Sequence, residues 1–268
     1  MYKASFDMKL TPFVRNIPVS ALYESPFMTE TLSRLDHAAE NRLFCVVTGD
    51  SGTGKSTLIR KFVENLPQRD YFPIYLSDSK LTPRWLYKGM LDPLGIEAKF
   101  YRGDAKRQLQ KELEILLGVH KKKVVCILDE AHLLEKETIE EFRFLLNYKF
   151  DSESPMALVL VGQTELRDKL KLQRYAAVRQ RINVNCVLRH LDRSETEQYI
   201  VSHLRYAGGR EDIFTDIAMD VIHQGALGIP REINRICENS LLYASQQGKR
   251  LIDEHTVSFV MEHEMLNA

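Results

Sequence analysis

Short apolar runs rich in β-branched residues alternate with stretches of helical periodicity along the first two thirds of the chain. Runs of this kind are typical of the strands of a parallel sheet, which are buried on both faces. The predicted strands are Phe44–Thr48, Tyr71–Leu76, Val124–Leu128, Ala157–Val161 and Ile182–Leu188. Between the strands, one-sided apolar stripes predict helices such as Ser56–Leu66 and Lys106–Leu117. The alternation predicts an α/β fold, a three-layer αβα sandwich with helices on both faces of a parallel sheet.

The pattern changes after Leu191, where helical periodicity continues without a further strand. Asp192 and Glu195 have the spacing of a capping box, and Gly208-Gly209 marks the end of the helix that they open. Further helices are predicted at Thr215–Gln224, Arg231–Gln247 and Asp253–Leu266. We therefore predict two domains, an α/β domain with an N-terminal extension at 1–190 and a small all-helical lid at 191–268.

The composition adds little to this division but limits the partners. Lys plus Arg and Asp plus Glu both number 37, so the net charge is zero and any basic binding face must be local. The four cysteines lie far apart without metal-ligand spacing, which favours buried free thiols in a reducing compartment. The chain begins without the apolar core of a signal peptide, and no apolar run approaches ~20 residues. We therefore expect a cytoplasmic protein that makes no use of a membrane.

One segment fits the pattern GxxxxGK[ST] of a phosphate-binding loop, with an apolar strand before it and an amphipathic helix after it. Glycines let the backbone N–H groups point at phosphate oxygens, and the helix N-terminus adds positive potential. Lys55 is predicted to bridge the β- and γ-phosphates of ATP, and the Ser56 hydroxyl to bind Mg²⁺. The strand–loop–helix context disfavours the alternative, a glycine-rich turn that fits by chance. The residues assigned to ATP binding are Gly49, Asp50, Ser51, Gly52, Thr53, Gly54, Lys55, Ser56 and Thr57.

A second candidate segment, the acidic pair Asp129-Glu130, follows the strand Val124–Leu128. Asp129 emerges at the carboxyl end of this strand, where ligands bind in open α/β sheets, and is predicted to hold Mg²⁺. Glu130 is predicted to orient and polarise the attacking water. The alternative is that the two acids only cap the following helix. The letters Asp-Glu-Ala-His also spell a helicase box, but no other helicase motif accompanies them, so we interpret His132 as incidental.

Four more polar residues have the placement that hydrolysis between subunits requires. Gln163 follows the strand near 157–162 and could position water or the γ-phosphate; a helix-capping role is the alternative. Arg179 or Arg181, before the last strand, could reach a neighbouring subunit's γ-phosphate as an arginine finger, or belong to a solvated basic face. Arg231 lies in the first turn of a helix, where the helix dipole disfavours a cation unless it faces an anion or a salt-bridge partner.

Taken together, these segments resemble the AAA+ superfamily of ATPases. The resemblance implies Walker A at 49–56, Walker B at 124–130, sensor 1 at Gln163, an arginine finger at Arg181 or Arg179, and sensor 2 at Arg231. More narrowly, the chain resembles the ExeA/TniB-like group, which includes transposition helper ATPases related to TnsC and MuB. The segments that carry this resemblance are Thr11-Pro12-Phe13, Tyr23-Glu24-Ser25-Pro26, Leu32 to Ala39, Gly162-Gln163-Thr164-Glu165-Leu166, Gln180-Arg181-Ile182 and Gly228-Ile229-Pro230-Arg231.

The resemblance leaves two main roles open. A transposition helper uses ATP to form homo-oligomeric rings or filaments on double-stranded DNA and recruits a transposase to its target. A secretion ATPase of the ExeA type shares the motifs but is expected to continue into a membrane segment and a cell-wall-binding region. Because this chain stops at Ala268, we expect the helper. An origin-recognition-type loader is a further alternative, although no winged-helix domain is recognisable.

A DNA-binding helper needs a basic face. One segment, Lys99–Arg107, mixes cations, aromatics and a glycine, and is predicted to form a turn between helices that follows the phosphate backbone. A solvated turn with Phe100 packed inward is the alternative. The residues assigned to DNA binding are Lys99, Tyr101, Arg102, Lys106 and Arg107, with Lys80 and Arg84 as a second site.

Overall fold

The structure, a computed structural model, describes residues 2–78, 81–147 and 153–265. Two compact units divide the chain. The α/β unit comprises residues 27–51 and 55–188. The helical unit comprises residues 2–26, the loop residues 52–54, and the chain from residue 189 onward.

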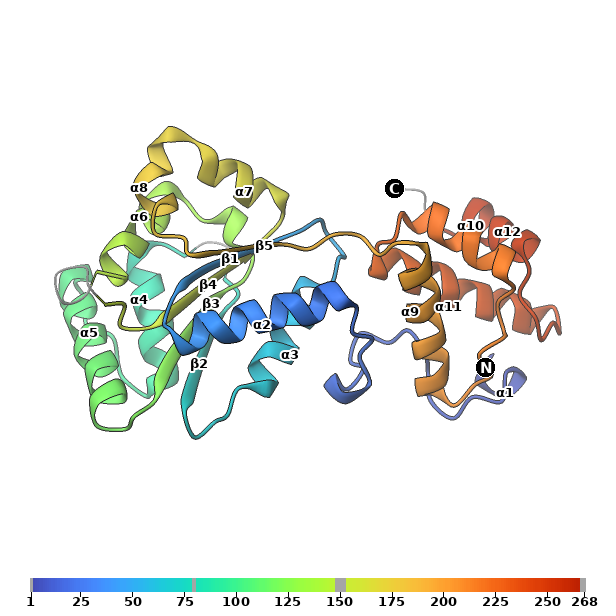
Figure 1. Ribbon diagram of the computed structural model, residues 1–268, viewed down its shortest axis with the longest axis horizontal. Coiled ribbons are helices and arrows are strands. Elements are labelled where there is room, and N and C mark those ends of the chain that lie inside the picture. Colours follow the sequence, from blue (N-terminus) through green and yellow to red (C-terminus); the bar gives the residue numbers. More distant parts are fainter. Residues whose placement is uncertain (1, 79–80, 148–152, 266–268) are drawn as a thin grey trace. The chain divides into compact units, whose positions relative to one another are not determined.

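Within the described residues of the α/β unit, five parallel strands form one sheet (Figure 1). The strands are β1 (Phe44–Thr48), β2 (Tyr71–Leu76), β3 (Lys123–Leu128), β4 (Ala157–Gly162) and β5 (Val184–Val187). Their spatial order is β2-β3-β4-β1-β5, so β4 lies between β1 and β3. The predicted parallel sheet is confirmed, with β5 shorter at both ends than the predicted 182–188.

Helices cover both faces of the sheet, because successive side chains of each buried strand point to opposite sides. Cys45 and Val47 of β1 pack with α2 and α3, whereas Phe44 and Val46 pack with the helices of the other face. That other face carries α4 to α8. The predicted three-layer sandwich is therefore confirmed. The helices are α2 (Pro26–Glu40), α3 (Lys55–Asn65), α4 (Pro83–Leu91), α5 (Arg102–Gly118), α6 (Lys136–Leu145), α7 (Thr164–Lys171) and α8 (Ala176–Arg179).

One sequence-based boundary is wrong in a way that matters for the DNA-binding prediction. Helix α5 begins at Arg102, four residues before the predicted start at Lys106. Tyr101 has the extended backbone of an N-cap residue, and Asp104 in the first turn suits the positive end of the helix. Residues 102–107 are therefore helical, and only the part of the Lys99–Arg107 segment that precedes Arg102 is a connection between helices.

The helical unit is built from both ends of the chain. Its helices are α1 (Tyr2–Ser5), α9 (Arg193–Ala207), α10 (Asp216–Ala226), α11 (Pro230–Gln246) and α12 (Glu254–His263). Tyr2, Phe6, Met8 and Phe13 belong to the same buried apolar cluster as these C-terminal helices. This grouping differs from the sequence-based division, which put the N-terminal extension with the α/β domain. Among the described residues, no helix has the length and apolar character needed to cross a membrane.

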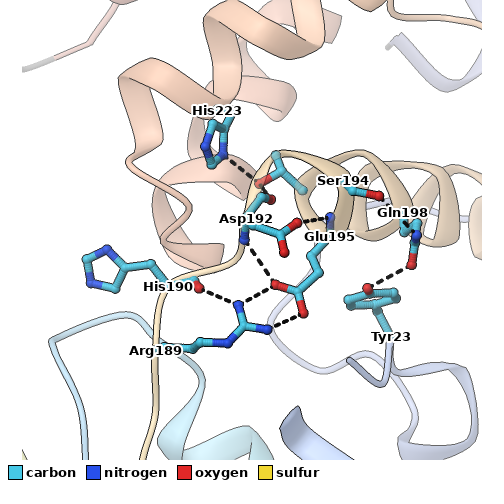
Figure 2. A network of polar contacts seen from close by, with 9 residues as sticks. Tyr23, Arg189, His190, Asp192, Ser194, Glu195, Gln198 and His223 are labelled. Atoms are coloured by element: carbon cyan, nitrogen blue, oxygen red, sulfur yellow. Dashed lines mark hydrogen bonds and ion pairs between the residues drawn. The ribbon is translucent and has the colours of Figure 1, made fainter. Parts of the chain in front are cut away.

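The start of α9 is fixed by a polar network within the helical unit (Figure 2). The Asp192 side chain accepts a hydrogen bond from the Glu195 backbone N–H, and the Glu195 carboxylate accepts one from the Asp192 N–H, which confirms the predicted capping box. Arg189 adds a bidentate pair to the same Glu195 carboxylate, with one N–O distance of 2.7 Å. Nearby, the Tyr23 hydroxyl donates to Gln198, and so attaches the N-terminal segment to α9.

Candidate active site

Three strands deliver the predicted ATPase residues to one edge of the sheet. Thr48 at the end of β1 lies level with Gly162 at the end of β4, and Leu128 at the end of β3 pairs with Leu160. The chain continues from these three strand ends into the phosphate-binding loop, the Asp129–Glu130 pair and Gln163. The carboxyl edge of an open parallel sheet is where ligands bind, so the fold brings the predicted groups together as the motifs require.

The phosphate-binding loop has the backbone that its glycines permit. Gly52 and Gly54 have φ values of 84° and 94°, in the region that L-residues with a side chain rarely adopt. Lys55 is the first residue of α3, and its ammonium donates to the carbonyl oxygens of Gly49 and Asp50 at 2.7 and 2.8 Å. The cation is thus held inside the curve of the loop, beside a helix N-terminus that favours anions.

The side chains predicted to hold Mg²⁺ converge on one carboxylate. Asp129 is buried, and its Oδ2 atom accepts hydrogen bonds from the Ser56 hydroxyl at 3.3 Å and the Tyr75 hydroxyl at 2.7 Å. A carboxylate beside a serine hydroxyl is an all-oxygen donor set, which fits Mg²⁺. Burial and the hydrogen bond to Asp129 raise the pKa of Tyr75, so this phenol stays protonated and donates.

Tyr75 is a site residue that sequence reasoning missed. It lies on β2, next to β3, and pairs in register with Ile127, two residues before Asp129. The sequence contains the tyrosine but not the strand order that places it beside the acidic pair. Its alternation on β2, with Ile74 and Leu76 buried, shows only that it points away from that core.

Glu130 follows Asp129 in a left-handed backbone conformation, with φ 53° and ψ 30°. Its N–H donates to Oδ1 of Asp129 at 2.9 Å, and its carboxylate lies 3.5 Å from Nδ1 of His132. The carboxylate is partly exposed at the edge of the sheet, as a water-activating group must be. The Glu130 side chain makes no capping bond to the short helix that follows, so the helix-capping alternative does not describe this residue.

Gln163 occupies the N-cap position of α7 without a side-chain capping bond. The helix-capping alternative is therefore wrong for its amide. Its backbone N–H instead lies 3.4 Å from Nδ1 of His132, and the neighbouring Thr164 hydroxyl donates to the Asp50 carboxylate at 2.7 Å. The start of α7 therefore contacts both the phosphate-binding loop and the turn at 129–132, which we call the acidic turn.

The two candidate arginine fingers have different surroundings. The Arg179 guanidinium donates to the carbonyl oxygens of Leu170 and Lys171 at 2.8 and 2.7 Å, and so caps the C-terminus of α7. Arg181 donates to the Ala177 carbonyl oxygen at 3.2 Å. Both guanidinium groups are therefore engaged by backbone carbonyl oxygens, and the finger role of Arg179 or Arg181 stays a prediction.

Arg231 lies in the helical unit as the second residue of α11. The turn before it has left-handed backbone at Leu227 and Gly228, with φ values of 50° and 71°. A Cβ atom at Gly228 would lie 2.0 Å from the Leu191 carbonyl oxygen, so a side chain does not fit there. The Gly-Ile-Pro-Arg sequence therefore shapes the start of α11, and the sensor role of Arg231 stays a prediction.

The residues predicted to bind DNA are divided by their partners. Arg102 forms an ion pair at 3.1 Å with Glu141, a carboxylate that is only 4% exposed. Arg107 pairs with Asp104 at 2.6 Å on the surface of α5. These two guanidinium groups each have a carboxylate partner within the α/β unit. Lys80 lies outside the described residues.

Two of the other cations predicted to bind DNA, Arg84 and Lys106, lie beside exposed aromatic rings. The Arg84 guanidinium lies 4.2 Å from the Phe100 ring centroid, and the Lys106 ammonium 4.7 Å from that of Phe144. Phe100 and Tyr101 are 66% and 71% exposed, so the alternative in which Phe100 packs inward is wrong. Trp85, which the sequence did not single out, is half exposed beneath Lys88. We call Arg84, Trp85, Lys88, Lys99, Phe100, Tyr101 and Lys106 the α4–α5 surface.

The chain is similar to known proteins along nearly its whole length. Residues 37–170 match the family described as AAA domain. General secretion pathway protein A of Aeromonas hydrophila is 30% identical over 264 residues, which are 96% of this chain and 47% of that protein. The chain therefore spans about half the length of this curated relative.

Solved structures with little sequence identity share the fold. The ORC2 protein of Aeropyrum pernix, solved in ADPNP–ADP complexes, has a TM-score of 0.69 at 14% identity, covering 96% of this chain and 72% of that chain. The ORC1 protein of the same organism, solved in complex with DNA, has a TM-score of 0.67 at 15% identity, covering 92% of this chain and 68% of that chain.

Proposed function

Because the chain belongs to the AAA domain family of ATPases, we propose that it binds ATP with Mg²⁺ at Gly49–Ser56 and hydrolyses it with Glu130 as the water-activating carboxylate. The observation that carries this proposal is the convergence of Lys55, Asp129 and Glu130 at the carboxyl edge of β1 and β3. Each supplies a different requirement of phosphoryl transfer: a cation for the phosphates, an oxygen for the metal and a base for water.

The site residues act together on the nucleotide. Lys55 would exchange its loop carbonyl partners for phosphate oxygens. Ser56 and Asp129 would hold Mg²⁺, which would neutralise the charge that develops on the phosphates. Glu130 accepts a proton from the attacking water as the bond from the water oxygen to the γ-phosphorus forms. The bond from the γ-phosphorus to the oxygen shared with the β-phosphate breaks, so that ADP and phosphate leave. Gln163, at the end of the strand between the two motifs, contacts the γ-phosphate or this water.

Glu130→Gln should bind ATP but lose turnover by about a hundredfold or more, because an amide does not take up the water's proton. Lys55→Ala should lose ATP binding, because the phosphates lose the cation of the loop. The measurements are ATP affinity and steady-state phosphate release. Glu137→Gln, the same change on the exposed first turn of α6, is the matched control and should behave as wild type. Wild-type turnover in Glu130→Gln would remove Glu130 from the mechanism.

For the process that uses hydrolysis, the proposal is a cytoplasmic transposition helper that assembles on double-stranded DNA with ATP and recruits a transposase. The α4–α5 surface supports it, because cations and exposed aromatic groups gather there on a chain whose net charge is zero. Cations on one face give phosphate contacts that depend little on base sequence. The fold is also one on which the Aeropyrum pernix ORC1 protein has been solved with DNA.

A secretion ATPase is the second candidate. It is favoured by the 30% identity to general secretion pathway protein A over 96% of this chain. A secretion role predicts no ATP-dependent affinity for DNA, so DNA binding separates the two candidates.

Wild-type protein should bind a labelled duplex more tightly with ATP than with ADP, because assembly aligns many copies of the α4–α5 surface. Lys99→Ala/Lys106→Ala should weaken binding at least tenfold and reduce the salt slope of log K by about 2, since two phosphate contacts are lost per subunit. Fluorescence anisotropy over a salt series, with ATP and then ADP, measures both.

The matched control is Lys111→Ala/Lys122→Ala, which removes two charges from other positions on α5 and the segment after it. If wild type shows no ATP-dependent binding at low salt, the helper proposal fails and the secretion candidate stands. If both double variants bind as wild type does, the α4–α5 surface is not the DNA interface.

A further inference from the structure

We propose that His132 is a positioning residue for hydrolysis, whose Nδ1 atom links the Glu130 carboxylate to the start of α7. The inference rests on the proposed role of Glu130 as the base. It assigns a function to a residue that the Asp-Glu-Ala-His sequence alone left without one.

The geometry places one imidazole nitrogen between two parts of the site. Nδ1 of His132 lies 3.5 Å from Oε2 of Glu130 and 3.4 Å from the backbone N of Gln163. The side chain is only 10% exposed, so water competes little for these contacts. Glu130 follows β3 and Gln163 follows β4, and the imidazole therefore bridges two neighbouring strand ends.

Residues of β4 and α7 also hold the backbone around His132 in place. The Lys169 ammonium, on α7, donates to the carbonyl oxygens of His132 and Leu134 at 2.6 and 3.0 Å. Gly162 packs so closely that an added Cβ atom would lie 3.1 Å from the His132 backbone N. The contacts of Lys169 and Gly162 support the left-handed backbone conformation of Glu130. This conformation costs a residue other than glycine on the order of 1–3 kcal/mol.

A single nitrogen serves both partners only one at a time. Without a proton, Nδ1 accepts the Gln163 N–H and leaves the Glu130 carboxylate able to take a proton from water. With a proton, Nδ1 donates to Glu130 and holds the carboxylate in place. The exchange between these two bonds couples the base to Gln163.

The start of α7 connects the two Nδ1 bonds to the phosphate-binding loop. Thr164 bonds to Asp50 in the phosphate-binding loop, so a change in that loop on binding the phosphates reaches α7. The neighbouring Gln163 N–H then approaches Nδ1 or withdraws from it. His132 thereby makes the state of Glu130 depend on what the loop holds.

Amide substitutions separate the contact from the packing. Asparagine places a polar atom near the position of Nδ1, whereas glutamine places one near Nε2, so His132→Asn should keep turnover within about threefold. His132→Gln and His132→Phe should lower kcat about tenfold or more, a loss typical of residues that orient a reacting group, while ATP affinity stays unchanged. The measurements are kcat, KM, ATP affinity and thermal unfolding of each variant, with Glu130→Gln beside them.

Equal kcat in the asparagine and glutamine variants would overturn the inference, as would a loss that follows ATP affinity rather than kcat. If His132→Phe does not fold, the asparagine and glutamine pair alone decides. Loss of turnover in Glu130→Gln without loss in His132→Gln refutes the inference and spares the proposed base. Full turnover in Glu130→Gln refutes both.

Discussion

Arg102 pairs with a carboxylate that lies beneath the protein surface. Glu141 on α6 is 4% exposed, and it also accepts a hydrogen bond from the buried Tyr87 hydroxyl on α4. One carboxylate therefore joins three helices of the α/β unit. Without Arg102 the charge of Glu141 would keep only a neutral partner among these, and an uncompensated buried charge is strongly destabilising.

Arg102→Ala should lower the free energy of unfolding by about 1–2 kcal/mol. Breaking a fully buried ion pair costs about 3–5 kcal/mol, but Arg102 is 59% exposed and water screens part of the interaction. Chemical denaturation measures the change, and Arg107→Ala, which breaks the surface pair with Asp104, should stay within about 0.5 kcal/mol of wild type.

Measuring DNA affinity beside stability separates a structural role of Arg102 from a role as a phosphate contact. If Arg102→Ala leaves stability unchanged and weakens duplex binding as much as the Lys99/Lys106 pair does, Arg102 is a phosphate contact after all. A loss of stability with little loss of DNA affinity identifies it as a support for the start of α5.

The strands were the elements most accurately predicted from the sequence. Phe44–Thr48 and Tyr71–Leu76 match β1 and β2 at both ends, because each is a short run of apolar and aromatic residues. The start of α5 was misplaced, because residues 102–105 lack an apolar stripe and the helix is fixed there by Tyr101 and Asp104 instead.

The candidate site was predictable where its residues are close in sequence. The phosphate-binding loop and the Asp129–Glu130 pair each lie in one short segment next to a recognisable strand. Tyr75 and His132 were missed because their contacts cross between neighbouring strands, which only the folded sheet brings together. Tyr75 on β2 bonds to Asp129 after β3, and His132 after β3 contacts the backbone of Gln163 after β4. The capping role of Arg179 likewise depends on where α7 ends.

The segment that follows α7 carries a candidate arginine finger, which would act only if subunits assemble. Helix α7 contacts the phosphate-binding loop and the acidic turn, and the segment after it carries Arg181. If subunits assemble with ATP, an arginine on this segment completes a neighbour's site by stabilising charge in the transition state.

Arg181→Ala should retain ATP binding and lower the ATPase rate by about 10³-fold or more, the contribution of an arginine finger. Mixing it with Glu130→Gln protein should restore some activity, because a mixed interface combines an intact Glu130 with an intact Arg181. Phosphate release across mixing ratios measures the effect. Arg179→Ala is the comparison, since its guanidinium caps α7 and its loss should reduce stability more than turnover. An unchanged rate in Arg181→Ala, or no recovery on mixing, would argue against a finger at this position.

The helical unit takes its N-terminal segment from a part of the chain that is synthesised long before the rest of it. Residues 2–26 emerge from the ribosome before the α/β unit, and their partners in α9 to α12 follow only after it. At about 5–20 residues per second, this interval lasts on the order of 10–30 s. At the end of this interval the α/β unit has its complete sequence, whereas Tyr2, Phe6, Met8 and Phe13 still have no core to enter. Until α9 to α12 are made, these apolar side chains lack the partners among which they are buried in the folded unit.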